Sequence, residues 1–448
     1  MRSLRTALTL AMAFGAPVAW SADLVEVFEM AHASDPTLQA AEANRYSVAE
    51  GTVQARARLL PQVSGSYTWS NTDSESLQTS LDVESTPSTS DADSRDLRLR
   101  LDQTIYDHSN YTQLAGARAN AARAEADYDS AFDALLFRTT DAYFAVLTAQ
   151  DGLAFAEAEE KAVRRQLDQA EQRFEVGLSA ITDVHEARAR ADQSRASAIL
   201  AQNAVDDALQ ALEEITGQPV GQLKRLREEL PLDPPEPAIP DQWVDQAVSL
   251  SPSLKSREYQ LESANHAVDT AKAGHYPTVS AFVSYSDNTT RGDRTFAGIP
   301  GLADSEDERT TIGVTLNVPI FAGGATQSGV RQAVYNREAA VDNVEAERRA
   351  VTRSTRNAYR AVIAGLSEVQ ARQQALVSAR SALEATEAGF EVGTRTIVDV
   401  LISQQVLFQA QRDHSQARHN LVLNRLRLKQ SSGTIDVADL QQINALLQ

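Results

Sequence analysis

The segment Arg173-Phe-Glu-Val-Gly-Leu-Ser-Ala-Ile-Thr-Asp-Val184 interrupts a long helical pattern, and a similar segment recurs later in the chain. The second segment is Gly389-Phe-Glu-Val-Gly-Thr-Arg-Thr-Ile-Val-Asp-Val400, which begins 216 positions further on (389 minus 173). A glycine that ends a helix adopts positive φ without a steric penalty. Gly177 and Gly393 therefore predict two sharp turns, each between two long helices.

The same offset of 216 residues relates landmarks along the whole chain, which indicates an internal duplication. The matched landmarks are Pro36 with Pro252, Pro61 with Pro277, Ala142-Tyr143 with Ala358-Tyr359, and Gly217 with Gly433. We expect a first copy over residues 23–217 and a second copy over residues 241–433. A linker over residues 218–240 joins the copies, and residues 434–448 form a C-terminal segment.

One stretch in each copy alternates between apolar and polar residues. The apolar members are Leu97, Leu99, Leu101 and Ile105 in the first copy, and Ile312, Val314, Leu316, Val318 and Ile320 in the second. A period of two places these side chains on one face of a strand and leaves the other face polar. Each strand belongs to a predicted β-hairpin, over residues 61–106 in the first copy and 277–321 in the second.

The first strand of each hairpin is expected upstream, at residues 63–69 and 279–285. Between the paired strands lie residues 71–96 and 287–309, which are rich in Ser, Thr, Asp and Gly. This composition is typical of turns, so both segments are predicted to be long loops.

After each hairpin the pattern becomes helical. Ala, Glu, Gln and Arg dominate residues 117–173 and 333–388, where Pro and Gly are nearly absent. These residues are strong helix formers. A helix of roughly 60 residues spans roughly 90 Å at about 1.5 Å per residue, so a coiled-coil-like assembly is indicated. Each copy then holds a long helical hairpin, with its tip near residues 174–183 or 390–399.

The N-terminal residues 1–22 resemble a secretory signal peptide, because Arg2 and Arg5 precede a short apolar stretch that ends in small residues. A membrane anchor is the alternative interpretation. Later in the chain no run reaches the roughly 18 apolar residues that a membrane-spanning helix needs. The chain is therefore expected to be exported without a helical anchor.

Composition excludes several classes of function. With 0 Cys there is neither a disulfide framework nor a thiolate metal site. A net charge of −19 argues against nucleic acid as a partner. His414 and His419 are five positions apart, a spacing that does not favour metal chelation, and no nucleophile-and-base or phosphate-loop motif occurs. We predict no enzymatic activity, no cofactor and no metal.

Hairpins with one apolar face, joined to very long helices, suggest an outer-membrane β-barrel that continues as helices in the periplasm. Single-chain barrels start at about eight strands, so four strands per chain require an oligomeric barrel. The alternative is a soluble sandwich or hairpin cap on an ordinary coiled coil.

Three motifs resemble the TolC family of outer-membrane efflux and type I secretion channels. They are Arg173 to Val184, Val392-Gly-Thr-Arg-Thr-Ile-Val-Asp-Val-Leu401, and Arg165-Gln-Leu-Asp-Gln169. The resemblance implies a mainly α homotrimer, with four strands per chain in a shared twelve-stranded barrel in outer-membrane lipid and a periplasmic tunnel of twelve helices. The linker and the C-terminal segment would then lie at its equator. The implied partners are a periplasmic adaptor (membrane fusion) protein and an inner-membrane pump of the RND, ABC or MFS type.

The resemblance also implies a gate at the tips. Arg395 would bond to Thr182 and Asp183 of a neighbouring coil and hold the tip closed. Phe390 replaces the family's tyrosine in this network and has no hydroxyl to donate, so the closed state would depend more on Arg395. The alternative for Arg395 is a solvated cation at a helix end.

Asp399 is the expected pore residue, because three copies around a trimer axis would form a ring of carboxylates that binds cations. Ile402 replaces the family's second pore aspartate, so one acidic ring beside a hydrophobic ring is expected. Asp399 could also be a carboxylate at a helix N-terminus. A periplasmic coiled-coil adaptor or structural envelope protein remains the rival class of function, with an envelope hydrolase a distant third.

Overall fold

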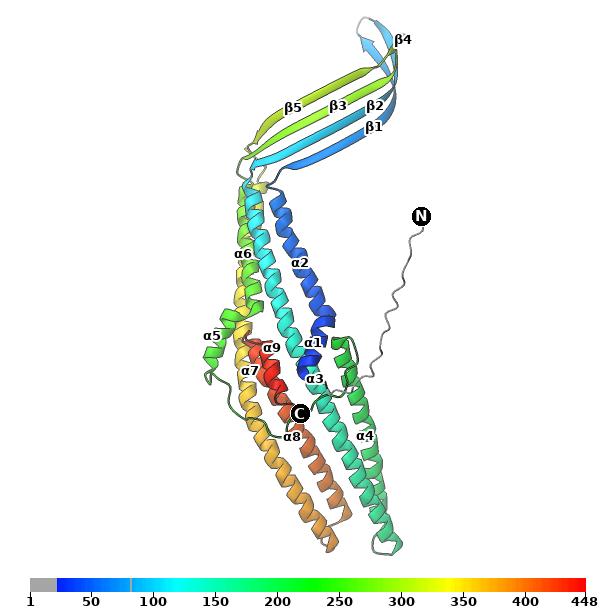
Figure 1. Ribbon diagram of the computed structural model, residues 1–448, viewed down its shortest axis with the longest axis vertical. Coiled ribbons are helices and arrows are strands. Elements are labelled where there is room, and N and C mark those ends of the chain that lie inside the picture. The colour runs from blue at the N-terminus through cyan, green and yellow to red at the C-terminus, as the bar shows by residue number, and fades with distance from the viewer. Residues whose placement is uncertain (1–21, 81–82) are drawn as a thin grey trace, which may run out of the picture. The chain divides into compact units, whose positions relative to one another are not determined.

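The computed structural model describes residues 22–80 and 83–448, so the predicted signal peptide lies outside the described residues except for Ala22 (Figure 1). The chain divides into two units. One contains the residues up to Glu42 together with Tyr128–Pro252 and Arg348–Gln448. The other contains Ala43–Asp127 and Ser253–Glu347.

The second unit holds an antiparallel sheet. Its strands are β1 (Gln62–Ser80), β2 (Val83–Tyr106), β3 (Thr278–Phe296), β4 (Ile299–Leu302) and β5 (Ser305–Asn317). Strand β1 pairs with β2, β2 pairs with β3, and β3 pairs with both β4 and β5. Figure 1 shows β1, β2, β3 and β5 side by side in this order. Because β2 comes from the first copy and β3 from the second, the sheet joins the two halves of the duplication, with Leu99 opposite Tyr285.

The prediction of long loops is wrong, because the polar segments continue the strands. Asn71 lies opposite Asp93 in the ladder of β1 and β2, and its Nδ2 atom donates to the Oδ1 atoms of Asp91 at 3.1 Å and Asp93 at 3.3 Å. Ser94 and Thr290 similarly share a hydroxyl hydrogen bond of 3.2 Å between β2 and β3. Pairing satisfies the backbone whatever the side chains are, and cross-strand polar contacts then stabilise the ladder.

The prediction that Val318 and Ile320 belong to this strand is wrong, because β5 ends at Asn317. Pro319 separates these two residues and has no N–H to donate to a sheet. Within β5, Ile312, Val314 and Leu316 alternate on one face and are 76%, 68% and 63% exposed. The apolar face that the alternation predicts is therefore present, and it is uncovered in the single chain.

Four long helices form two helical hairpins. The first is α3 (His108–Glu175) with α4 (Ile181–Thr216), and the second is α7 (Ala325–Glu391) with α8 (Ile397–Ser431). Helices α3 and α7 contain 68 and 67 residues. Either one spans roughly 100 Å at about 1.5 Å per residue. None of the described helices is both long and apolar enough to cross a membrane.

The shorter helices repeat the duplication. They are α1 (Leu24–Ser34), α2 (Pro36–Ala57), α5 (Pro240–Leu250), α6 (Pro252–Ala273) and α9 (Val437–Asn444). Helices α2 and α6 both begin at a proline, whose fixed φ suits the first helical turn. The main core of the first unit surrounds Tyr143 and Phe144 of α3, both 0% exposed, and draws residues from α1, α4, α8 and α9.

Candidate functional site

The two turns at the tips of the helical hairpins have the same backbone structure. Gly177 and Gly393 have φ of 77° and 80°. In the first turn the N–H of Leu178 donates to the carbonyl of Arg173 at 2.8 Å, and in the second Thr394 donates to Gly389 at 2.8 Å. These bonds are those of a Schellman motif. A methyl group at Gly177 or Gly393 would meet no other atom within 4 Å, so positive φ alone requires glycine there.

The next helix begins differently in the two copies. Thr396 caps α8, since its hydroxyl accepts from the N–H of Asp399 at 3.2 Å while its own N–H donates to Asp399 Oδ2 at 2.9 Å. The equivalent residue before α4 is Ala180, which has no side-chain cap. Asp399 is thus held in a reciprocal capping box. Its counterpart Asp183 lies in the first turn of α4 without such a cap.

These bonds affect the charge of Asp399. The backbone N–H of Thr396 is the largest cause that lowers the pKa of Asp399, followed by the Thr396 hydroxyl, and nearby Arg395 adds a smaller attraction. Asp399 is therefore a carboxylate at a helix N-terminus within the single chain, as one of the two interpretations predicted, and the bonds to Thr396 keep it ionised.

The pore-facing residues predicted on α8 lie together. Ile397, Val400 and Leu401 are 2%, 1% and 3% exposed, whereas Ile402 is 45% exposed. Asp399 and Ile402 are three positions apart, a spacing that places them on one side of a helix. Helix α8 therefore packs one side against its own chain and leaves Asp399 and Ile402 on a more exposed side.

The structure does not bring the whole predicted gate network together within one chain. Arg395 and Thr182 are exposed, and no hydrogen bond or ion pair joins Arg395 to Thr182 or Asp183 among the described residues. The space that Arg395 occupies depends on Gly389, because a methyl group at Gly389 would lie 2.8 Å from Arg395 Cγ.

Sequence reasoning missed a contact of Phe390. The guanidinium of Arg173, in the last turn of α3, lies 4.8 Å from the centre of the Phe390 ring in the last turn of α7. Phe390 also packs on an apolar cluster from α3, α4 and α8, with Val163, Ala170, Val184, Ala187, Ala191, Ile397 and Leu401 as its buried members. A signal existed, since the repeat counterpart of Arg173 is Gly389 and the copies differ there.

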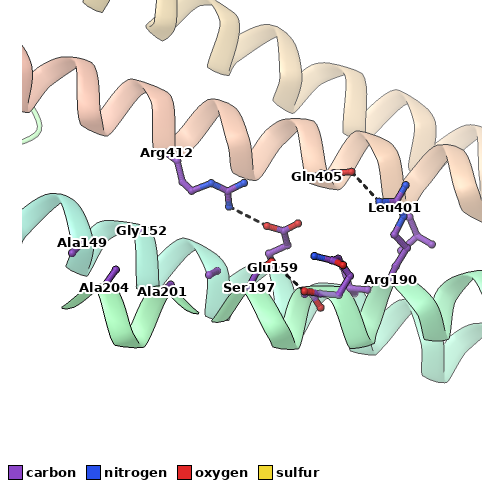
Figure 2. Close-up of a pocket in the computed structure, with 14 residues that line it drawn as sticks. Ala149, Gly152, Glu159, Arg190, Ser197, Ala201, Ala204, Leu401, Gln405 and Arg412 are labelled. Atoms are coloured by element: carbon purple, nitrogen blue, oxygen red, sulfur yellow. Dashed lines mark hydrogen bonds and ion pairs between the residues drawn. The ribbon is translucent and has the colours of Figure 1, made fainter. Parts of the chain in front are cut away.

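Further from the tips, polar contacts flank a cavity of about 380 Å³ between α3, α4 and α8 (Figure 2). Arg190 of α4 donates to Gln405 Oε1 of α8 at 3.3 Å. Arg412 of α8 forms an ion pair of 3.0 Å with Glu159 of α3. Small residues such as Gly152 line much of the cavity wall.

The histidines form no metal centre. His419 is 2% exposed, and its Nδ1 atom lies 2.8 Å from the Thr148 hydroxyl. Burial lowers the pKa of His419 to about 4, so the ring is neutral at ordinary pH. Within residues 22–80 and 83–448 no group of three metal-ligating side chains occurs.

Comparison with known proteins identifies the family. The model of the family described as outer membrane efflux protein matches residues 27–218 and again residues 243–434. The two matches begin 216 residues apart (243 minus 27), which confirms the duplication.

Individual relatives agree with this match. Outer membrane protein TolC of Vibrio cholerae is 35% identical over 431 residues, covering 96% of this chain and 94% of its own length. The alkaline protease secretion protein AprF of Pseudomonas aeruginosa is 27% identical over 429 residues, covering 95% of this chain and 88% of AprF. The CmeC outer membrane channel of Campylobacter jejuni shares the fold, with a TM-score of 0.75, 17% identity, and coverage of 95% of this chain and 90% of CmeC. The resemblance predicted from the sequence is confirmed, and the chain belongs to the outer membrane efflux protein family.

Proposed function

We propose that this protein is the outer-membrane exit duct of tripartite efflux pumps, type I protein secretion systems or both. The protein lies in the outer membrane and extends into the periplasm. The observation that carries the proposal is a long antiparallel sheet with an uncovered apolar face, in a chain whose two halves both match the efflux family. The rival class, a periplasmic adaptor or structural protein, would expose such an apolar face to water.

The duct is assembled from three chains. Strands β1 and β5 each pair with only one strand among the described residues, so the sheet has two open edges. Open edges are normally covered or paired. Strands β4 and β5 pair with successive parts of β3, so together they take one place in the sheet and each chain offers four places. Two further copies would pair both edges and close a twelve-stranded barrel, while the long helical hairpins of three chains would form a tunnel of twelve helices.

The long barrel strands contain more residues than are needed to cross a bilayer. Strands β1 and β2 contain 19 and 24 residues, and about 9–11 residues suffice to cross a bilayer. Most of the apolar residues lie in the half of each strand next to the helices, where they alternate with polar residues, and the far half is mainly polar. The far half therefore projects beyond the lipid.

The duct receives its substrates from partners. An inner-membrane pump of the RND, ABC or MFS type supplies the energy, and a periplasmic adaptor joins the pump to the helical tips. The chain itself acts as a passive conduit and performs no catalysis.

The tips form the gate. Arg395 of one coil binds Thr182 and Asp183 of a neighbouring coil, and Asp183 is suited to this role because its helix has no capping box to occupy it. An exposed ion pair contributes only about 0.2–1 kcal/mol, so three such pairs hold the tips closed and still yield to a partner. Asp399 and Ile402 then form an acidic and a hydrophobic ring at the constriction.

Exchange of Arg395 tests the gate. Arg395→Ser should raise the resting conductance of the purified channel in planar bilayers, because it removes the cation from each of three contacts. Arg337→Ser, which changes a cation on α7 far from the tip in sequence, serves as the control. An unaltered resting conductance in Arg395→Ser would count against the clamp.

The duct itself is tested by its physical state. Protein extracted from outer membranes should migrate as a heat-modifiable trimer and conduct ions across planar bilayers. Recovery as a soluble monomer that does not insert would rule out the duct.

A further inference from the structure

The arginines in the part of the long helices that leads to the tips fall into two groups. The groups differ in whether the arginine contacts its own helical hairpin or the other one. Some act within one helical hairpin: Arg188 of α4 pairs with Glu171 of α3 at 2.7 Å, and Arg372 of α7 pairs with Asp413 of α8 at 2.8 Å. Others join one hairpin to the other. This second group consists of Arg173, Arg190 and Arg412.

The joining arginines act at three successive levels. Arg173 stacks on Phe390 next to the turns, Arg190 donates to Gln405 further along, and Arg412 pairs with Glu159 beyond that. Figure 2 shows the contacts of Arg190 and Arg412, which flank the cavity of about 380 Å³. At the level of Phe390 the hairpins also share an apolar cluster, whereas at the levels of Arg190 and Arg412 the cavity interrupts the packing and polar side chains contribute to the connection.

All three joining arginines occupy positions at which the two copies differ. At the offset of 216 residues, the counterparts of Arg173, Arg190 and Arg412 are Gly389, Val406 and Ala196. The duplicated scaffold therefore does not explain these arginines. Each cation is present once per chain, and each reaches across the boundary between the copies.

Arg173 has the most direct relation to the tip. Its partner Phe390 lies in the last turn of α7, three residues before Gly393, and packs on the cluster that contains Ile397 and Leu401 of α8. The counterpart of Phe390 in the first copy is Phe174, which is 42% exposed. A cation held over an aromatic face is attracted by the ring quadrupole, and this attraction needs no hydroxyl group.

We propose that Arg173, Arg190 and Arg412 form a clasp that holds the two helical hairpins of each chain together, and that the stacking of Arg173 on Phe390 is the level that positions the α7–α8 turn in the closed state. This inference deepens the proposed gate and rests on it. In this proposal, opening of the tip moves α7 and α8 away from α3 and α4, which requires the Arg173–Phe390 contact to break.

Conductance in planar bilayers tests the positioning role. Arg173→Gln and Phe390→Leu should each raise the resting open probability roughly two- to fivefold per chain, the range expected for loss of an exposed cation–π contact. Phe390→Trp keeps a π face and should retain the closed state. If Phe390 only filled space, Phe390→Leu would stay closed and the larger ring of Phe390→Trp would raise the resting open probability. The double variant Arg173→Gln/Phe390→Leu should open no more than either single variant.

Arg188→Gln is the matched control, because Arg188 has a similar exposed ion pair but acts within one hairpin. It should leave the resting conductance unchanged. Equal opening by Arg188→Gln and Arg173→Gln would overturn the clasp, because any lost charge would then have the same effect.

A chemical cross-link measures hairpin separation independently of conductance. The chain contains 0 Cys, so Arg190→Cys with Gln405→Cys gives one reactive pair per chain for a short bis-maleimide. This pair replaces the Arg190 level of the clasp, so the experiment tests the level of Arg173 alone. Adding Arg173→Gln should lower the yield of the intrachain cross-link, and adding Arg188→Gln should not. An unchanged yield refutes the clasp. A lowered yield in a channel that is open throughout supports the clasp and refutes the proposed gate.

Discussion

At the scale of single residues, the first and second copies share the turn glycines but differ at a few positions beside them. Position 180 is Ala in the first copy and its counterpart 396 is Thr, so only Asp399 enters a capping box. The bonds that begin α8 also lower the pKa of Asp399 and keep its carboxylate ionised, as the proposed cation-binding ring requires.

The acidic ring is tested by a change of charge. Asp399→Asn should relieve block of the channel by divalent or polyamine cations in planar bilayers, because it removes three carboxylates from the constriction. Asp192→Asn, at an exposed carboxylate of α4 outside the proposed gate, should not relieve it. Persistent block in Asp399→Asn would exclude this ring as the binding site.

The pH dependence follows from the lowered pKa of Asp399. A carboxyl whose folded pKa lies below its unfolded value contributes stability above the unfolded pKa, and this stability is lost as pH falls through the folded pKa. Cation block should therefore persist at a pH where an ordinary aspartate, with a pKa of about 3.9, is already half protonated. Block that disappears well above that pH would indicate instead that mutual repulsion within the ring raises the pKa.

At the scale of elements, helix ends and the linker show how local chemistry supports the long hairpins. The capping box at Thr396 should contribute to the stability of the first turn of α8, and the equivalent turn of α4 lacks that contribution.

Exchange of the caps tests this difference. Thr396→Ala should destabilise the start of α8 by about 0.5–2 kcal/mol, seen as faster hydrogen exchange in the first turn of that helix. Ala180→Thr should slow exchange at the start of α4, where Asp183 already occupies the position needed for a capping box. Equal exchange in both helices before and after substitution would show that tertiary packing alone fixes these ends.

The linker between the copies is held by hydrogen bonds to its backbone. Tyr143 donates its hydroxyl to the carbonyl of Lys224 at 2.9 Å, and its repeat counterpart Tyr359 donates to Ala238 at 2.6 Å. Arg425 of α8 donates to the carbonyls of Pro231 and Asp233 between them. Burial raises the pKa of Tyr143, so its hydroxyl stays protonated and able to donate.

Loss of either hydroxyl should loosen one end of the linker. Tyr143→Phe leaves a buried carbonyl without its donor and should cost about 1–3 kcal/mol, more than Tyr359→Phe because Tyr143 is 0% exposed. Thermal unfolding and hydrogen exchange across residues 224–238 measure the effect. Tyr335→Phe, at a tyrosine that is 66% exposed, provides the control and should change neither.

At the scale of the whole molecule, the uncovered sheet face and the two open sheet edges require surroundings that one chain does not supply. In the proposed duct, lipid would cover the apolar face and further copies would pair with the edges. Assembly and membrane insertion should therefore depend on the same few strand residues.

A positive charge placed on one face of β5 or on the other tests which face contacts lipid. Val314→Arg places a cation on the apolar face and should reduce the yield of outer-membrane trimers, since an arginine near the bilayer midplane costs about 2–4 kcal/mol. Thr315→Arg places the same cation on the opposite face and should be tolerated. Trimer yield on gels without heating measures both. Equal yields would mean that this face does not contact lipid.

The sequence by itself determined the duplication, the long helices, the turn glycines and the alternating strands, because each depends on local periodicity or on a backbone preference. It also identified the family through motifs at the tips. It failed for residues 71–96 and 287–309, whose turn-like composition was overruled by cross-strand pairing. Only the tertiary structure showed that Arg173 meets Phe390 and that Tyr143 and Tyr359 hold the two ends of one linker. These contacts join residues far apart in the chain, and no local pattern records which distant partner a side chain will meet.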